Sequence, residues 1–77
     1  MTRLQEKRLE NGLSQSKLSK KADVNLRMLQ RYEQGSANID KANILTILKL
    51  AIALNCNISD FVTNEEILRA LKKYESR

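Results

Sequence analysis

The fold is decided by SQSKLSKKADVNLRMLQRYEQG, residues 14 to 35. The stretch holds two short segments whose apolar residues have helical spacing, and only Asp23-Val24-Asn25 separates them. The spaced residues are Leu18 and Ala22 in the first segment and Leu29 and Tyr32 in the second. A connection this short cannot turn the second helix back antiparallel to the first. The stretch therefore predicts two steeply crossing helices, the helix-turn-helix geometry that offers its second helix to the major groove of DNA.

Capping residues mark the limits of these two helices. Ser14 and Asn25 have side chains that favour a helix N-cap. Gly35 suits the left-handed residue that follows a helix. We therefore predict helices over residues 15–22 and 26–34.

The outward side of the second of these helices carries side chains that suit base edges. With Leu29 and Tyr32 facing inward, the residues left outside are Leu26, Arg27, Gln30, Arg31 and Gln34. Arginine pairs bidentately with guanine, glutamine with adenine, and leucine can contact the methyl group of thymine. An ordinary polar face is the alternative interpretation. The position directly after the short join favours DNA binding.

Lys17, near the start of the first of these helices, is a further candidate for contact with DNA. It stands where the helix dipole disfavours a cation and where a capping box would have an acidic residue. A nearby phosphate would offset this cost. Simple tolerance of a surface lysine is the alternative.

Four further helices are predicted from caps and apolar spacing. The first begins after Thr2 and turns Leu4 and Leu9 inward. The others are a fourth helix that is capped by Asn38 or Asp40 and ends near Leu54, a short fifth helix opened by Asn57 and Asp60, and a final helix over residues 64–75 opened by Thr63 and Glu66. We predict an all-α fold, with a compact five-helix domain over residues 1–62 and an additional amphipathic helix in residues 63–77.

Two of these helices carry more apolar surface than a small core needs. The fourth is apolar on nearly every side, and such a helix is hard to enclose fully in a chain of 77 residues. The final helix has an apolar stripe of Ile67, Leu68, Leu71 and Tyr74, for which core packing and dimerisation both remain open.

Positive charge is concentrated in the half of the chain that holds the two-helix stretch. The net charge is +5, of which residues 1–35 supply +4 and residues 36–77 supply +1. This asymmetry suits a polyanionic partner, although a solvated surface would also explain the total. With 4% aromatic residues, the chain has no aromatic cluster for stacking on RNA bases, so RNA binding ranks below duplex DNA.

The composition gives no support to an enzyme, a metal site or a membrane protein. The chain has no histidine, the single cysteine Cys56 and 2 glycines, and hence no zinc ligand set, no histidine acid–base pair and no glycine-rich phosphate loop. We expect no enzymatic activity, no metal, no cofactor and no small-molecule substrate. The apolar run 44–54 is too short to span a bilayer, and one cysteine fits a reducing compartment. We therefore expect a cytoplasmic protein without a membrane partner.

Much of the chain resembles the Cro/cI-type helix-turn-helix repressors, also called the XRE family. The resemblance rests on LQEKRLENGLSQSKLSKKADVNLRMLQRYEQG followed by ILTILKLAIALNCNISDFV, and covers about residues 3–62. Its markers are Gly12-Leu13-Ser14-Gln15, Leu18, Val24, Leu29, Tyr32-Glu33, Gly35 and Leu48-Lys49-Leu50-Ala51. Several spaced features in the right order form a specific signal. The resemblance implies a lambda-repressor-like fold for the five-helix domain.

The resemblance also implies roles for single residues. Family members have a glutamine at the start of the second helix that contacts a phosphate and braces the recognition helix, whose first two turns contact bases or phosphates. In this chain these positions are Gln15 for the first role and Asn25, Leu26, Arg27, Gln30 and Arg31 for the second. Arg8 and Glu33 match a structural ion pair between the first helix and the end of the third.

Three departures from the family pattern bear on these expectations. Asp23 stands where a glycine is usual, and aspartate tolerates the left-handed backbone better than most residues. The loop after Gly35 is longer than usual, so we carry over no contacts from it. Leu45 and Ile52 stand where polar residues are usual, which favours a contact surface on the fourth helix. The candidates for a dimer interface are Leu45, Ile52, Leu68 and Leu71.

Two functional hypotheses follow. The first is a sequence-specific regulator of transcription, expected to be a repressor, that binds double-stranded DNA as a homodimer. The second is a protein-interaction module, such as an antitoxin-type regulator, that works through the fourth and final helices and binds another protein.

Overall fold

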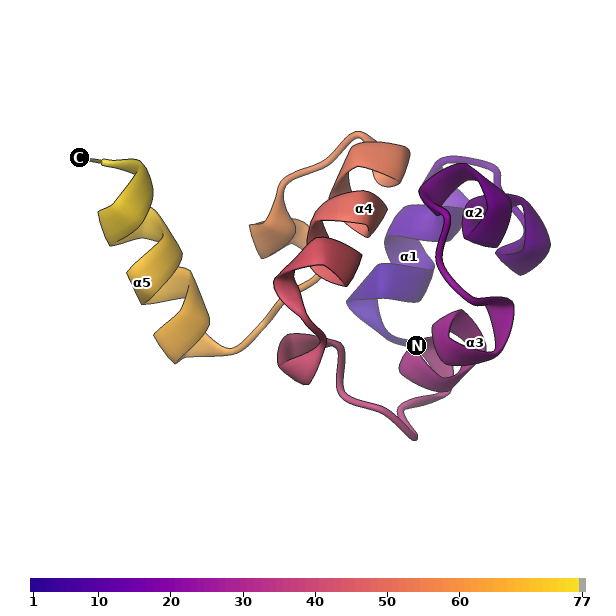
Figure 1. Cartoon of the computed structure of the whole chain (residues 1–77), viewed down its shortest axis with the longest axis horizontal. Coiled ribbons are helices and arrows are strands. Elements are labelled where there is room, and N and C mark those ends of the chain that lie inside the picture. Colours follow the sequence, from indigo (N-terminus) through magenta and orange to yellow (C-terminus); the bar gives the residue numbers. More distant parts are fainter. Residues whose placement is uncertain (77) are drawn as a thin grey trace.

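The computed structural model describes residues 1–76, and within that range every regular element is a helix. Helix α4 stands between the N-terminal helices and α5 (Figure 1). The elements are α1 (Arg3–Glu10), α2 (Gln15–Ala22), α3 (Leu26–Gln34), the 3-10 turn η1 (Ile39–Lys41), α4 (Ile44–Leu54), the 3-10 turn η2 (Ile58–Asp60) and α5 (Glu65–Glu75). The predicted all-α fold class is confirmed. Residue 77, the last of the predicted segment 63–77, lies outside the described residues.

The first three helices begin at the predicted caps. The Thr2 hydroxyl accepts a hydrogen bond from the Gln5 backbone N–H (3.2 Å), and the Ser14 hydroxyl accepts one from the Lys17 N–H (3.1 Å). Asn25 caps α3 through its side-chain oxygen, which accepts from the Met28 N–H (3.1 Å). The predicted helices over residues 15–22 and 26–34 are confirmed.

The start of α4 was predicted wrongly. Its N-cap is Asn43, whose side-chain oxygen accepts from the Thr46 N–H (2.8 Å), and neither Asn38 nor Asp40 caps it. Asn38 instead caps the separate turn η1, because its side-chain oxygen accepts from the Asp40 N–H (3.0 Å). The end of α4 near Leu54 is confirmed.

The C-terminal elements agree with the prediction only in part. The short fifth helix is opened by Asn57 and Asp60 as predicted, with the Asp60 carboxylate accepting from the Asn57 N–H (2.8 Å), but it is a single 3-10 turn, η2. Asn64, and not Thr63, caps α5. The N–H and hydroxyl of Thr63 bind the carboxylate of Asp40 instead (3.1 and 3.4 Å), so a tertiary contact takes the residue that local spacing had assigned to the helix.

Helix α1 turns Leu4 and Arg8 inward, and Leu9 outward. Leu4 is 1% exposed, whereas Leu9 is 50% exposed, so the predicted burial of Leu9 is wrong. Residues i and i+4 share a helix face, which places Arg8 beside Leu4 on the inner side. An arginine can occupy that position because its charge pairs with a buried acidic side chain.

The core joins the α2–α3 unit to α4. Leu18 of α2, Leu29 of α3 and Leu50 of α4 are each 0% exposed. The buried apolar residues as a set are Leu4, Leu18, Ala22, Val24, Leu29, Ile47, Leu50, Ala51, Ala53, Leu54, Phe61 and Val62. Because α4 supplies five of them and packs against α2, it serves as the base of the α2–α3 unit.

Helix α5 stands apart from the N-terminal bundle (Figure 1). Ile67 and Leu68 pack against the outside of the core and are partly buried, whereas Tyr74 is 67% exposed. The final helix therefore leaves Ile44, Leu45, Leu48 and Ile52 of α4 exposed.

Candidate nucleic-acid interface

The join between α2 and α3 is held by buried side chains and polar contacts. Val24 lies in the core, and its carbonyl oxygen accepts a hydrogen bond from the Ser19 hydroxyl (2.5 Å). Asp23 has the expected left-handed backbone (φ 56°, ψ 48°). Its carbonyl oxygen and carboxylate both lie near Nζ of Lys49 on α4 (3.4 and 3.5 Å), a contact that no sequence pattern predicts. These contacts set the position of α3 relative to α2 and α4.

Helix α3 presents an exposed ridge at Leu26, Arg27 and Arg31. Leu26 is 37% exposed, and both arginines are exposed as predicted. Within residues 1–76, neither guanidinium forms an ion pair with a protein carboxylate. The ridge is therefore free to bind an external group.

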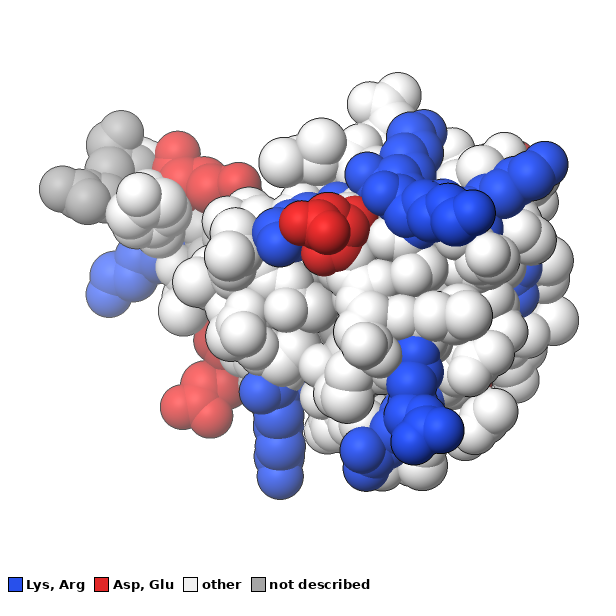
Figure 2. All heavy atoms as spheres, turned by 45° about the vertical axis from the view of Figure 1, so that its right-hand side comes forward, with Lys and Arg blue, Asp and Glu red and all other residues white. Residues whose placement is uncertain are grey.

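Basic side chains extend the ridge onto α2. Figure 2 shows lysines and arginines over the side of the molecule that carries α2 and α3, with few acidic side chains among them. On α2 the exposed lysines are Lys17, Lys20 and Lys21. The surface around α3 thus attracts anions.

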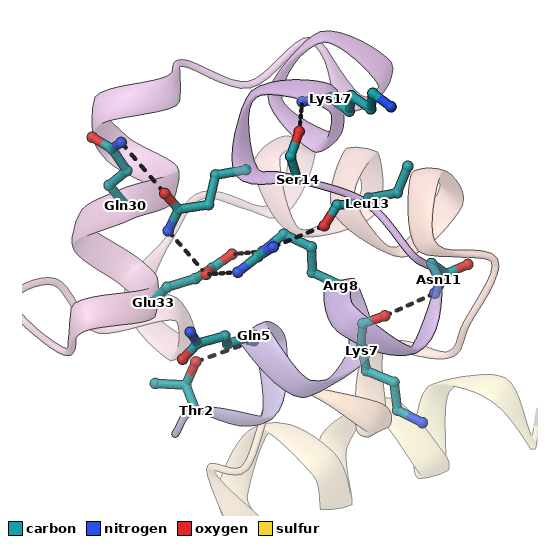
Figure 3. A network of polar contacts seen from close by, with 11 residues as sticks. Thr2, Gln5, Lys7, Arg8, Asn11, Leu13, Ser14, Lys17, Gln30 and Glu33 are labelled. Atoms are coloured by element: carbon teal, nitrogen blue, oxygen red, sulfur yellow. Dashed lines mark hydrogen bonds and ion pairs between the residues drawn. The ribbon is translucent and has the colours of Figure 1, made fainter.

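A buried ion pair lies beneath the ridge. The Nε and Nη2 atoms of Arg8 donate to the two carboxylate oxygens of Glu33 (2.8 and 3.0 Å), and Nη1 donates to the carbonyl oxygen of Leu13 (2.8 Å). Figure 3 shows the two side chains facing each other, and Arg8 and Glu33 are buried, with exposed fractions of 7% and 6%. The ion pair expected from the family resemblance is present, and it ties α1 to the C-terminal end of α3.

Two glutamines connect this ion pair to the surface. Nε2 of Gln15 donates to Glu33 Oε1 (3.1 Å), and Nε2 of Gln30 donates to Gln15 Oε1 (3.4 Å). Both glutamines are half-buried, so the expectation that Gln30 lies fully outside is only partly met. Gln30 is drawn inward because it bonds across to α2.

The other candidates for DNA contact lie at the N-terminal ends of α2 and α3. The side chain of Lys17 is exposed, and no polar partner holds it among the described residues. Asn25 is exposed while its oxygen caps α3, which leaves the amide nitrogen outward. Lys17 and Asn25 thus lie in the same two-helix unit as the other candidates, which are Gln15, Leu26, Arg27, Gln30 and Arg31. Contact of these residues with DNA remains a prediction.

The candidates for a dimer interface divide into two groups. Leu45 and Ile52 on α4 are 58% and 77% exposed, whereas Leu68 and Leu71 on α5 are partly buried. Ile44 and Leu48, which are 63% and 41% exposed, were not among the predicted candidates. The spacing i, i+4, i+8 from Ile44 to Ile52 was the available signal for this α4 stripe, defined by Ile44, Leu45, Leu48 and Ile52.

Cys56 has the environment of a packing residue. It is partly buried against the core, and desolvation, aided by the nearby Asp60 carboxylate, raises the pKa of its thiol. The thiol therefore stays protonated and weakly nucleophilic at neutral pH. Within residues 1–76 there is no group of three or more histidine, cysteine or acidic residues that could hold a metal ion, and no helix has the length and apolarity needed to span a membrane.

Comparison with known proteins gives one match. A family model described as "Helix-turn-helix" matches residues 4–61, a range that runs from the second residue of α1 through α4 and η2. Neither the curated proteins nor the solved structures gave a match.

Proposed function

The chain belongs to the XRE-type helix-turn-helix family of DNA-binding transcription regulators, and from this premise we propose that it represses transcription as a homodimer. Helix α3 of each subunit lies in the major groove of one half-site of a roughly palindromic operator. The half-sites are about one helical turn, ~34 Å, apart. Residues 1–62 form the DNA-binding domain, and residues 63–77 contribute to the dimer contact.

The single observation that carries this proposal is the exposed ridge on α3. Its two arginines have no ion-pair partner within residues 1–76, and the buried Arg8–Glu33 pair and Leu29 hold the helix from beneath. A rigid helix with free bidentate donors is the arrangement that base recognition in the major groove requires.

Contacts with phosphate and with bases have separate roles in this proposal. Gln15 and Lys17, at the start of α2, bind phosphates and set the position of α3 on the duplex. The side chains that select the sequence lie on α3 or at its N-cap: Asn25, Leu26, Arg27, Gln30 and Arg31.

Selection of bound duplexes from a random DNA pool tests the proposal directly. We expect enrichment of one sequence with two related half-sites. Equal retention of all sequences by the folded protein would contradict sequence-specific binding.

Replacement of Lys17 by alanine is expected to weaken binding to all duplexes alike. Loss of one phosphate contact should reduce the slope of log K against log salt by about one unit. Binding measured by fluorescence anisotropy at several salt concentrations checks this result. Lys73→Ala, an exposed lysine on α5, is the matched control and should leave the slope unchanged. A Lys17→Ala variant with the native slope would remove Lys17 from the phosphate contacts.

The homodimer is supported by the α4 stripe, which is aliphatic and carries no charge. A surface of this kind is self-complementary, as a two-fold interface must be. Ile52→Glu is expected to shift the protein to monomer, because dimerisation would bury the introduced carboxylate without a partner. Size-exclusion chromatography with light scattering measures the mass.

Leu9→Glu is the matched control, since it places the same charge at an exposed leucine of another helix. It should leave the native mass unchanged. A dimer that persists in Ile52→Glu would place the interface elsewhere.

The same stripe favours the second candidate function, a protein-interaction module of the antitoxin type. In that case the free chain is a monomer, and it co-purifies with a protein partner that covers Leu45 and Ile52. A homodimer that selects one DNA sequence in the absence of any other protein would support the repressor and not the interaction module.

A further inference from the structure

A chain of hydrogen bonds runs from the buried ion pair to the surface of α3. It passes from Arg8 through Glu33 and Gln15 to Gln30 (Figure 3). The two ends of this chain differ in chemistry, because a guanidinium only donates and a carboxylate only accepts hydrogen bonds. The charged pair therefore determines the orientation of each glutamine amide in this series of hydrogen bonds.

The orientation of Gln15 follows from Glu33. A carboxylate oxygen can accept only from the amide nitrogen of Gln15, so Nε2 faces Glu33 (3.1 Å) and Oε1 faces α3. That oxygen can in turn accept only from the nitrogen of Gln30 (3.4 Å). The direction of both amides is thus set by donor and acceptor chemistry.

One edge of the Gln30 amide remains available. Its oxygen points away from the bond to Gln15 in Figure 3, and one of the two N–H groups on Nε2 is uncommitted. Gln30 therefore presents one acceptor beside one donor. In the major groove, adenine offers the matching pair, a donor at N6 and an acceptor at N7.

We propose that Glu33, acting through the positioning residue Gln15, orients Gln30 so that it selects adenine over guanine at one base pair of each half-site. This inference rests on the proposed function. Guanine offers two acceptors, O6 and N7, so in the held orientation the Gln30 oxygen faces the O6 acceptor, and turning the amide over to avoid this breaks the bond to Gln15. Either outcome weakens binding to guanine, and this cost is the source of the selectivity.

Gln15→Met tests the inference, because methionine keeps the side-chain length and removes both amide atoms. The relevant base pair is the one at which Gln30→Met loses the adenine preference. At that pair, Gln15→Met is expected to lower the ratio of adenine to guanine affinity by about fivefold, the effect of one neutral hydrogen bond. The ratio of adenine to guanine affinity is the proper readout. Loss of a phosphate contact by Gln15 would weaken binding equally to the duplex with adenine and to the duplex with guanine at this base pair.

A double-mutant cycle separates positioning from a merely structural effect. In the Gln30→Met background, Gln15→Met should leave the adenine-to-guanine ratio unchanged. Lys17→Ala should lower both affinities at the native ratio. A native ratio in Gln15→Met, or a native ratio in Gln30→Met, would overturn the inference while sequence-specific binding stands. Absence of sequence selection by the native protein would instead overturn the proposed function.

A measurement on the native chain keeps the test independent of variant folding. Nuclear Overhauser contacts between the side-chain N–H protons of Gln30 and the side chain of Gln15 are expected in the free protein. Their absence would also overturn the inference.

Discussion

Replacement of Glu33 by alanine is expected to lower the free energy of unfolding by about 3–5 kcal/mol. The change leaves the guanidinium of Arg8 buried at 7% exposure without the carboxylate that binds two of its nitrogens. It also removes the acceptor of the Gln15 amide. An uncompensated buried charge is among the few single changes that cost so much. Urea denaturation followed by circular dichroism measures the loss.

The double replacement Arg8→Met with Glu33→Leu is the matched control. It removes both charges together, and replacing a buried pair by apolar residues is often neutral. We expect the double variant to recover most of the lost free energy of unfolding. The part contributed by the hydrogen bond from Arg8 to the Leu13 carbonyl oxygen (2.8 Å) is not recovered. A loss below about 1 kcal/mol in Glu33→Ala would show that the pair behaves like an exposed one.

Arg27→Ala is expected to weaken binding to the selected operator by about 1–3 kcal/mol and to relax the preference at one base pair. The reason is the loss of two parallel hydrogen bonds to a base, since the Arg27 side chain is exposed and has no ion-pair partner within residues 1–76. Competition binding with operators altered at single positions measures both effects.

Arg69→Ala removes the same charge from an exposed site on α5 and serves as the control. It should retain the native preference at every position. If Arg27→Ala also retained operator affinity and base preference, α3 would not be the recognition helix.

Local sequence was enough to predict the elements that carry the candidate interface. Ser14 and Asn25 bond to backbone N–H groups three residues ahead, so their effect depends on nothing outside their own helix turn. The three-residue join likewise restricts the crossing of α2 and α3 without help from the rest of the chain. The exposed positions of Arg27 and Arg31 follow from helical spacing once Leu29 is placed inside.

Other predictions failed where a contact distant in sequence competes with a local one. Thr63 has the spacing of a capping box, yet it binds Asp40, 23 residues away. Gln30 was expected to lie outside on spacing alone, and its bond to Gln15 draws it inward. No periodicity in the sequence distinguishes these outcomes.

The sequence by itself determined the all-α class, the helix-turn-helix unit and the basic ridge on α3, because caps, short joins and amphipathic spacing act within a few residues of the chain. Only the tertiary structure decided that Arg8 is buried and Leu9 exposed, that Lys49 contacts the Asp23 turn, and that α5 leaves the α4 stripe open. These features depend on which surfaces meet after the helices have formed. Burial of a charged or apolar side chain is a property of that packing, and the local sequence does not contain it.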